Sequence, residues 1–360
     1  MDRVVKNIMN TLENAGYKAY LVGGYVRDLL MGRSSYDVDI CTNAKPEDLY
    51  CLFNSASSNN YGGIHLKVEQ FNVDITTFRE ELRYEKRRPV ELNYIDDVYV
   101  DLQRRDFTVN AILMDREGHV IDPLGGVNDL NQKILRMIGN VSQKIVEDPL
   151  RILRAIRFVA VLDFGLDDDL YLTLKQNCAL VCQLSEVRIK QEYSKILLSK
   201  NFQKGLDLAQ ELGVNQALGI TYESVVYTSD LLGMWAQINF LNNAFTNAEK
   251  SNIIKITEVV NKRKIDVATL YKYGLYIAIT AGNILGLSTK EVRKMYEMLP
   301  IKQRSDIKVA ADEIIEILQL KDKRKLHLVY EDLEMHIVTG ELENTIRSIE
   351  RYLIENKGKW

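Results

Sequence analysis

The sequence predicts an α+β protein, in which an N-terminal head with a small mixed sheet is followed by an all-helical body and tail. Strand-like and helix-like segments alternate over residues 1–140, as in a mixed α/β unit. Beyond residue 148, apolar residues recur at three- and four-residue spacing, and only one proline, Pro300, follows Pro149. The predicted domains are a head at 1–140, a helical neck at 141–200, and a helical body and tail at 201–360.

Each element of the head has its own signal in the sequence. Helical spacing of apolar residues, with a glycine or proline near one end, predicts helices at 4–12, 25–31 and 46–53. Short apolar or alternating runs predict strands at 18–22, 37–41, 65–70 and 72–78. Residues 79–99 are charged and aromatic without a clear period, so we expect a mobile loop or lid there.

Composition and charge limit the classes of function. The net charge of −3 excludes a protein that is basic throughout, but arginines cluster locally at Arg104-Arg105 and from Arg151 to Arg157. No stretch approaches the roughly 20 apolar residues of a membrane span, so we expect no membrane association. The N-terminus carries no signal-peptide pattern and the four cysteines are scattered, so we expect free thiols and a reducing, cytoplasmic location.

The pair Asp37 and Asp39 is the strongest sign of chemistry in the chain. On a strand, residues two apart point to one face, so the two carboxylates would lie side by side while Val38 turns into a core. Adjacent carboxylates repel unless a cation lies between them, and hard oxygen ligands suit Mg²⁺. The upstream pair Gly23-Gly24 lets backbone N–H groups approach a phosphate closely. This combination is typical of phosphoryl transfer, with Asp74 on a neighbouring strand as a candidate third carboxylate.

Two arginine-rich segments follow the aspartate pair. Arg104-Arg105 would neutralise triphosphate charge beside a metal site, and Asp106 or Thr108 would cap the short helix that follows. Further along, Asp148 is the expected N-cap of a helix that carries arginines at every third position, namely Arg151, Arg154 and Arg157. Apolar residues crowd these arginines, so their guanidinium groups need an anionic partner. A nucleotide or an RNA backbone would serve, and internal carboxylates are the alternative.

These segments, in this order, resemble the class II tRNA nucleotidyltransferases: the CCA-adding enzymes and their poly(A) polymerase relatives, within the polymerase-beta-like superfamily. The resemblance rests on Gly23-Gly24-x-Val26-Arg27-Asp28, Gly32-Arg33, Asp37-x-Asp39, Arg104-Arg105-Asp106-Phe107-Thr108-x-Asn110-Ala111 and Glu147-Asp148-x-x-Arg151. It implies a nucleotidyltransferase head, a neck that recognises the nucleotide and its base, and a body and tail that bind tRNA.

The resemblance also implies roles for most of the site residues. Asp37 and Asp39 would hold Mg²⁺, whereas Asp74 is a candidate catalytic carboxylate from its strand position and not from the resemblance. The implied nucleotide-binding residues are Gly24 and Arg27 for the incoming nucleotide, Arg105 for its triphosphate, Asp148 and Arg151 for the base, and Arg154 and Arg157 for the rest of the pocket. The implied reaction is addition of CCA to the 3′ end of tRNA, with CTP and ATP as substrates and the tRNA acceptor arm as partner.

Several functions remain open at this point. Addition of A alone, addition of CC alone and poly(A) synthesis use the same chemistry, and a non-catalytic tRNA-binding protein would keep the fold. The full-length segment 79–103 disfavours CC addition alone, and the short, weakly basic tail disfavours poly(A) synthesis. The chain also departs from the Gly-x-x-His-Gly-Thr-like turn of many relatives, and we assign no role to His65. The sequence does not indicate the oligomeric state.

Overall fold

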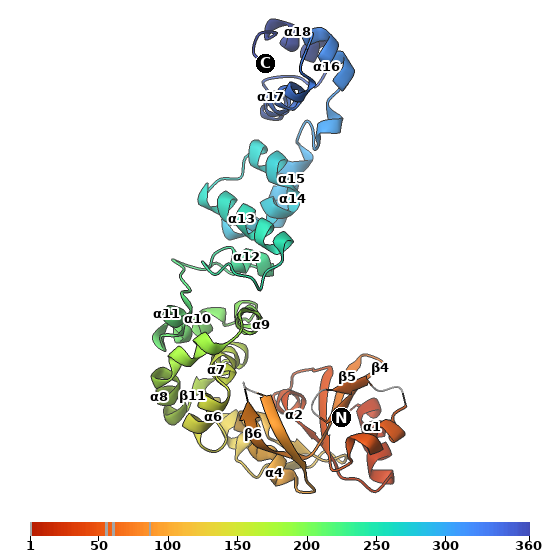
Figure 1. Ribbon diagram of the computed structural model, residues 1–360, viewed down its shortest axis with the longest axis vertical. Coiled ribbons are helices and arrows are strands. Elements are labelled where there is room, and N and C mark those ends of the chain that lie inside the picture. The colour runs from red at the N-terminus through yellow and green to blue at the C-terminus, as the bar shows by residue number, and fades with distance from the viewer. Residues whose placement is uncertain (1, 55–56, 60–61, 86–87) are drawn as a thin grey trace. The chain divides into compact units, whose positions relative to one another are not determined.

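The computed structural model describes residues 2–54, 57–59, 62–85 and 88–360. The chain divides into two compact units, Met1–Gly219 and Ile220–Trp360. The first unit holds the sheet, drawn in red and orange in Figure 1, and the helices from α1 to α11. All residues of the predicted site belong to this first unit.

A seven-stranded mixed sheet forms the centre of the head, in the order β3-β4-β5-β2-β1-β8-β9. Its strands are β1 (Ala19–Val22), β2 (Asp37–Thr42), β3 (Ser57–Asn59), β4 (Gly63–Val68), β5 (Phe71–Thr77), β8 (Leu113–Met114) and β9 (Val120–Ile121). Strands β2 and β5 run parallel, whereas the other neighbours are antiparallel. Four of these strands, β1, β2, β4 and β5, confirm the four predicted from the sequence to within two residues at each end.

Burial along β2 follows the predicted alternation. Val38 and Ile40 are buried, whereas Asp37 is exposed and Asp39 is half-buried. The predicted helices are also present, as α1 (Arg3–Asn14), α2 (Gly24–Leu30) and α3 (Pro46–Leu52). They pack against β1, β2 and β4. The head therefore has the α+β layout expected from the sequence.

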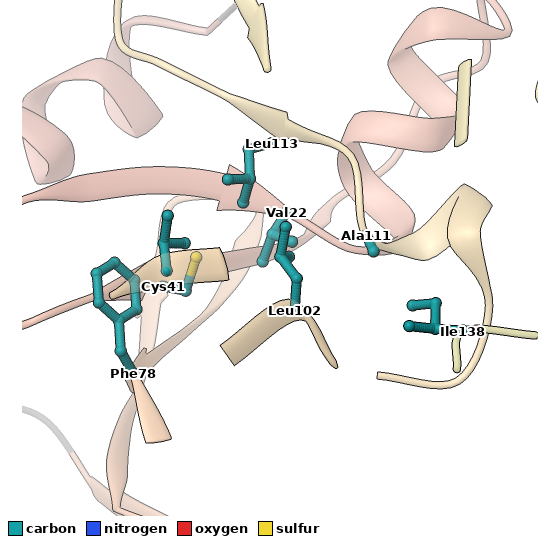
Figure 2. Packing of buried hydrophobic residues seen from close by; sticks show 8 residues of the cluster. Val22, Cys41, Phe78, Leu102, Ala111, Leu113 and Ile138 are labelled. Carbon is teal, nitrogen blue, oxygen red and sulfur yellow. The ribbon is translucent and has the colours of Figure 1, made fainter. Parts of the chain in front are cut away.

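A hydrophobic cluster lies on the face of β2 that carries Asp37 and Asp39. Figure 2 shows Cys41 of β2 packed with Val22 of β1 and with Leu102 of helix α4 (Val98–Gln103). Because Cys41 lies two residues after Asp39 on the same strand, both side chains point to the same face of the sheet. Packing of Leu102 on this face therefore brings the residues that follow α4, Arg104-Arg105, toward Asp39.

The prediction of a mobile loop or lid at 79–99 is wrong. Strands β6 (Arg79–Glu85) and β7 (Arg88–Tyr94) form a separate antiparallel sheet, and α4 begins at Val98. The base of this hairpin is held by polar contacts: the side chains of Arg79 and Glu81 form an ion pair of 2.8 Å, and each is only 8% exposed. Hydrophobic periodicity fails here because these buried positions are filled by paired charges.

Helices make up most of the remaining first unit. They are α5 (Gly126–Gln132), α6 (Val141–Glu147), α7 (Leu150–Leu162), α8 (Asp168–Gln176), α9 (Glu186–Leu197), α10 (Phe202–Glu211) and α11 (Val214–Leu218). A short parallel ladder between β10 (Ile134–Leu135) and β11 (Gly165–Leu166) interrupts the helical pattern. Helix α7 packs against α9 and α10, so its arginine-bearing side is set by buried apolar neighbours.

The second unit is mainly helical, as predicted. Its helices are α12 (Leu231–Trp235), α13 (Asn247–Asn261), α14 (Val267–Ile284), α15 (Thr289–Glu297), α16 (Ala311–Leu318), α17 (Leu326–Thr339) and α18 (Ile346–Glu355). Buried Trp235 stacks on Phe240 and meets Phe245 edge to face. In the described part of the chain, every helix is too short or too polar to span a bilayer.

Candidate active site

Three carboxylates lie on neighbouring strands at the centre of the sheet. The parallel register of β2 and β5 places Asp39 beside Asp74, and Asp37 beside Asn72. Asp37 Oδ1 accepts a hydrogen bond of 2.9 Å from Asn72 Nδ2. Asp74 Oδ1 lies 3.0 Å from His65 Nδ1, so the residue without a predicted role contacts a predicted catalytic one. Position in the sheet thus brings together the three carboxylates named from the sequence.

Asp39 is the most buried of the three and lies against the first glycine of the Gly23-Gly24 pair. Gly23 has φ of +77°, and a Cβ atom there would lie 2.5 Å from Asp39 Oδ2. Glycine is therefore required both for the backbone conformation and for space. Burial, helped by the charges of Asp74 and Asp37, raises the pKa of Asp39 above its usual range, although Arg105 and Arg27 oppose the shift. A bound cation would stabilise the charged form of a carboxylate in such surroundings.

The donor set fits a divalent cation that keeps much of its shell for other ligands. Within the residues that the structure describes, no group of three or more His, Cys, Asp or Glu side chains is arranged as a metal site by itself. Two carboxylates would need water and substrate phosphates to complete the coordination shell. Mg²⁺ is bound in this manner in many phosphoryl-transfer sites.

Arg105 lies beside the carboxylates and is held by Asp101. The Asp101 side chain is fully buried and accepts hydrogen bonds from Arg105 Nη2 at 3.2 Å and from Arg104 Nε at 2.8 Å. Across the described residues, Arg105 Nε is the one buried side-chain nitrogen or oxygen that lacks a hydrogen-bond partner. A buried donor of this kind calls for an acceptor, and a phosphate oxygen would provide one.

Asp106 connects the head to helix α7. Asp106 Oδ2 accepts hydrogen bonds from two nitrogens of Arg154, Nε at 2.8 Å and Nη2. Asp106 Oδ1 accepts a hydrogen bond from Asn110 Nδ2 at 3.1 Å. Asn110 in turn accepts from Arg27 Nη1 at 2.6 Å. Burial alone would raise the pKa of Asp106, but the charge and hydrogen bonds of Arg154 lower it to about 2.

The helix-capping role predicted for Asp106 or Thr108 is wrong. The short 3₁₀ helix Thr108–Asn110 has no side-chain cap, and Thr108 Oγ1 donates to Asp129 Oδ2 at 2.7 Å. Asp106 Oδ1 accepts from the backbone N–H of Phe107, before the helix, at 2.8 Å, and its Oδ2 forms the ion pair with Arg154. Both side chains stabilise contacts distant in sequence, which local spacing does not reveal.

The ring of Phe158 lies among three arginines. The guanidinium carbons of Arg157, Arg27 and Arg154 are 4.0, 5.4 and 5.5 Å from its centre. Arg157 Nε also donates to Glu192 Oε2 of α9 at 2.6 Å. Burial lowers the pKa of Arg157, although Glu192 opposes the shift. Arg154 and Arg157 therefore have internal carboxylate partners, which was the alternative weighed from the sequence.

Asp148 and Arg151 lie at the junction of α6 and α7. The prediction of Asp148 as N-cap of α7 is wrong, because the helix begins at Leu150 and its N-cap is Pro149. Asp148 Oδ1 still accepts from the backbone N–H of Leu150 at 3.1 Å. Arg151 is buried, and its Nη1 donates to the backbone carbonyl of Lys144 at 2.6 Å. Glu147 Oε2 lies 3.8 Å from the same nitrogen.

One cavity of about 480 Å³ brings most of the predicted site together. Eight of the ten predicted residues line it, namely Gly24, Arg27, Asp39, Arg105, Asp148, Arg151, Arg154 and Arg157. Asp37 and Asp74 are not among the lining residues, but they flank Asp39 in the sheet. The wall also includes Gly23 and Arg104, which belong to the two pairs predicted to meet phosphates. Its other residues had no predicted role or a capping role, namely Asp106, Asn110, Leu150 and Phe158.

Family models match most of the chain. The model described as "Poly A polymerase head domain" matches residues 19–136, and the model described as "Probable RNA and SrmB-binding site of polymerase A" matches residues 163–218. A third model, for tRNA nucleotidyltransferase domain 2, matches residues 240–353. The first of these covers the sheet, the aspartates and the arginine pair.

Named relatives extend over nearly the full length. The CCA-adding enzyme of Ligilactobacillus salivarius is 30% identical, over 98% of this chain and 95% of the relative. That of Streptococcus pyogenes is 29% identical, over 97% and 95%. A solved structure of the Bacillus stearothermophilus CCA-adding enzyme in complex with CTP has a TM-score of 0.86 and 26% identity, with 100% of this chain and 99% of the other covered.

These likenesses agree with the site geometry. The head model covers strands β2 and β5 with their three aspartates, and the full-length relatives carry one name. The chain belongs to the family of CCA-adding enzymes, which are tRNA nucleotidyltransferases.

Proposed function

We propose that this protein adds the nucleotides C, C and A to the 3′ end of tRNA, using CTP and ATP without a nucleic-acid template. The observation that carries the proposal is that a single cavity is lined by Asp39 and Arg105 and also by Asp148 and Arg151. The first pair suits chemistry at the triphosphate, and the second pair suits recognition of a base. The relative of known structure was crystallised with CTP.

Base choice follows from hydrogen-bond polarity. Cytosine and adenine each present an amino donor beside a ring-nitrogen acceptor, so a carboxylate accepts from the first and a guanidinium donates to the second. Uracil and guanine present a carbonyl beside an N–H, which opposes both contacts. The contacts of Asp148 and Arg151 with the base would then both be lost, at a cost of about 1–3 kcal/mol per contact. This pair would therefore accept C and A and reject U and G.

The reaction is an in-line attack of the tRNA 3′-hydroxyl oxygen on the α-phosphorus. A new oxygen–phosphorus bond forms, the bond to the β-phosphate oxygen breaks, pyrophosphate leaves, and the hydroxyl proton passes to solvent or a carboxylate. Arg105 would pair with the triphosphate, and Gly23-Gly24 would let the phosphates approach the backbone closely. Arg27, Arg154 and Arg157 would add positive charge around the nucleotide.

Asp37 and Asp39 would hold Mg²⁺, with Asp74 beside them as the third carboxylate. The raised pKa of Asp39 and the adjacent register of the three strand positions support a cation there. When bound, Mg²⁺ would lower the pKa of the attacking hydroxyl and stabilise charge on the leaving group. The tRNA acceptor arm would be held mainly through its phosphates, with affinity that falls as salt rises.

The test uses tRNAs that lack CCA, lack CA or lack only A, each incubated with single NTPs and with CTP plus ATP. We expect extension by three, two and one nucleotides, with no further growth. Addition only to the tRNA that lacks A would indicate an A-adding enzyme, and long products from ATP alone would indicate poly(A) synthesis. No extension, with tRNA still bound, would indicate a non-catalytic tRNA-binding protein. Asp39→Ala serves as the inactive control.

A further inference from the structure

Lys144 lies between the two parts of the nucleotide site. Its Nζ donates to the backbone carbonyls of Gln103 and Arg105, both at 2.6 Å. Its own backbone carbonyl accepts from Arg151 Nη1 at 2.6 Å. Arg105 and Arg151 both line the cavity. Lys144 therefore joins, from behind the cavity wall, the arginine proposed for the triphosphate and the arginine proposed for the base.

Helix α6 holds Lys144 in one position relative to the core. Helix α6 begins with Asn140 as its N-cap, whose Oδ1 accepts from the backbone of Gln143 at 2.9 Å, and Val141 and Ile145 anchor it in the core. Hydrogen bonds from an ammonium group are shorter and stronger than neutral ones. The two carbonyls are therefore held at a fixed distance from α6 and from Asp148, which follows it directly.

Arg105 is consequently fixed at two points. Asp101 Oδ2 accepts from its guanidinium at 3.2 Å, and Lys144 holds its backbone carbonyl. Asp101 belongs to α4 in the head, whereas Lys144 belongs to α6, next to the base-reading pair. The contact from Lys144 thus relates the backbone of Arg105 directly to the junction that carries Asp148 and Arg151, in addition to the ion pair between Asp106 and Arg154.

We propose that Lys144 is a positioning residue that sets the spacing between the base-reading pair and the triphosphate-binding Arg105. With this spacing fixed, a nucleotide binds productively only when its base and its triphosphate fit at the same time. Without Lys144, the triphosphate could bind while the base is poorly placed. This inference rests on the proposed function of the site.

The experiment compares wild type with Lys144→Met and Lys144→Arg, and uses Lys200→Met as a matched control. Lys200 is an exposed lysine of the same unit. Steady-state incorporation of CTP, ATP and UTP is measured on tRNA that lacks CCA, together with tRNA affinity and melting temperature. We expect Lys144→Met to raise KM for CTP and ATP about tenfold and to lower the preference for CTP over UTP about tenfold. The dissociation constant for tRNA should stay within about twofold of wild type.

Lys144→Arg should restore both KM and base preference, because a guanidinium also donates to two carbonyls, and Lys200→Met should match wild type. A folded Lys144→Met protein with wild-type KM and selectivity would overturn the inference, and so would a loss of kcat alone. Inactive wild type would contradict the proposed function itself, so the two failures are distinguishable.

A second measurement decides the matter if Lys144→Met does not fold. Burial, with Arg151 nearby, lowers the pKa of Lys144 to about 8, opposed by Asp106, Glu147 and Glu81. Between pH 7 and 9, Lys144 loses its proton and its hydrogen bonds lose charge assistance. The wild-type KM for CTP should therefore rise over this range, whereas that of Lys144→Arg should stay flat because arginine remains charged. Identical pH profiles for the two proteins would overturn the inference.

Discussion

At the scale of single residues, Gly23 leaves no room for a side chain beside Asp39. We expect Gly23→Ala to abolish nucleotide incorporation, because the new Cβ would lie 2.5 Å from Asp39 Oδ2 and displace the carboxylate. With φ of +77° and ψ of −148°, this backbone conformation is essentially restricted to glycine, so alanine there adds roughly 1–3 kcal/mol of strain. Incorporation assays and thermal unfolding measure the two effects separately.

Gly32 provides the control for this substitution. It also has a positive φ, of +67°, but in the described part of the chain, apart from its sequence neighbours and the helix before it, no atom lies within 4 Å of the position that its Cβ would take. Gly32→Ala should therefore lower the melting temperature while activity is retained. Equal activity in both variants would show that the contact between Gly23 and Asp39 is not needed for catalysis.

The charged side chain of Asp39 should lower the stability of the fold while it supports activity. Its pKa is raised in the folded protein, so folding favours the protonated form, and the charged form at neutral pH destabilises the fold when no cation is bound. In EDTA at pH 7, Asp39→Asn should raise the melting temperature, and this gain should shrink as pH falls through the pKa of Asp39. Added Mg²⁺ should stabilise wild type but not the variant. A lower melting temperature for Asp39→Asn in EDTA would contradict this account.

At the scale of elements, the ion pair between Asp106 and Arg154 ties the head to α7. Because the pKa of Asp106 is lowered to about 2, its charge contributes stability that is fully present above the unfolded-state pKa near 3.8 and is lost as pH falls toward 2. This shift corresponds to roughly 2 kcal/mol. Asp106→Asn should lower the melting temperature at pH 7, and the difference from wild type should narrow below pH 4. A difference that stays constant with pH would rule out this contribution.

Local patterns predict some elements of this fold and miss others. Strand β2 was predictable because Val38 and Ile40 alternate with Asp37 and Asp39, and such a period needs no distant partner. The hairpin at 79–94 was missed, since its buried base is filled by paired charges such as Arg79 and Glu81. Hydrophobic periodicity reports burial of apolar side chains only.

At the scale of the whole molecule, the site is assembled from distant parts of the chain. Motif spacing and family resemblance predict the ten site residues, but they do not predict the side chains that hold these residues in place. Glu192 holds Arg157 from 35 positions away, and Lys144 bonds to the carbonyl of Gln103 across 41 positions. Contacts of this kind depend on how helices pack, so one sequence does not reveal them.

We propose that the protein reads its nucleotides with Asp148 and Arg151, in the cavity that Asp39 also lines. The most direct test measures incorporation of CTP, ATP, UTP and GTP by wild type and Asp148→Ala on tRNA that lacks CCA. Asp169→Ala, at an exposed carboxylate of α8, is the control. We expect wild type and the control to use only CTP and ATP, and Asp148→Ala to admit UTP or GTP or to lose its preference. An active Asp148→Ala enzyme with unchanged selectivity would contradict the account.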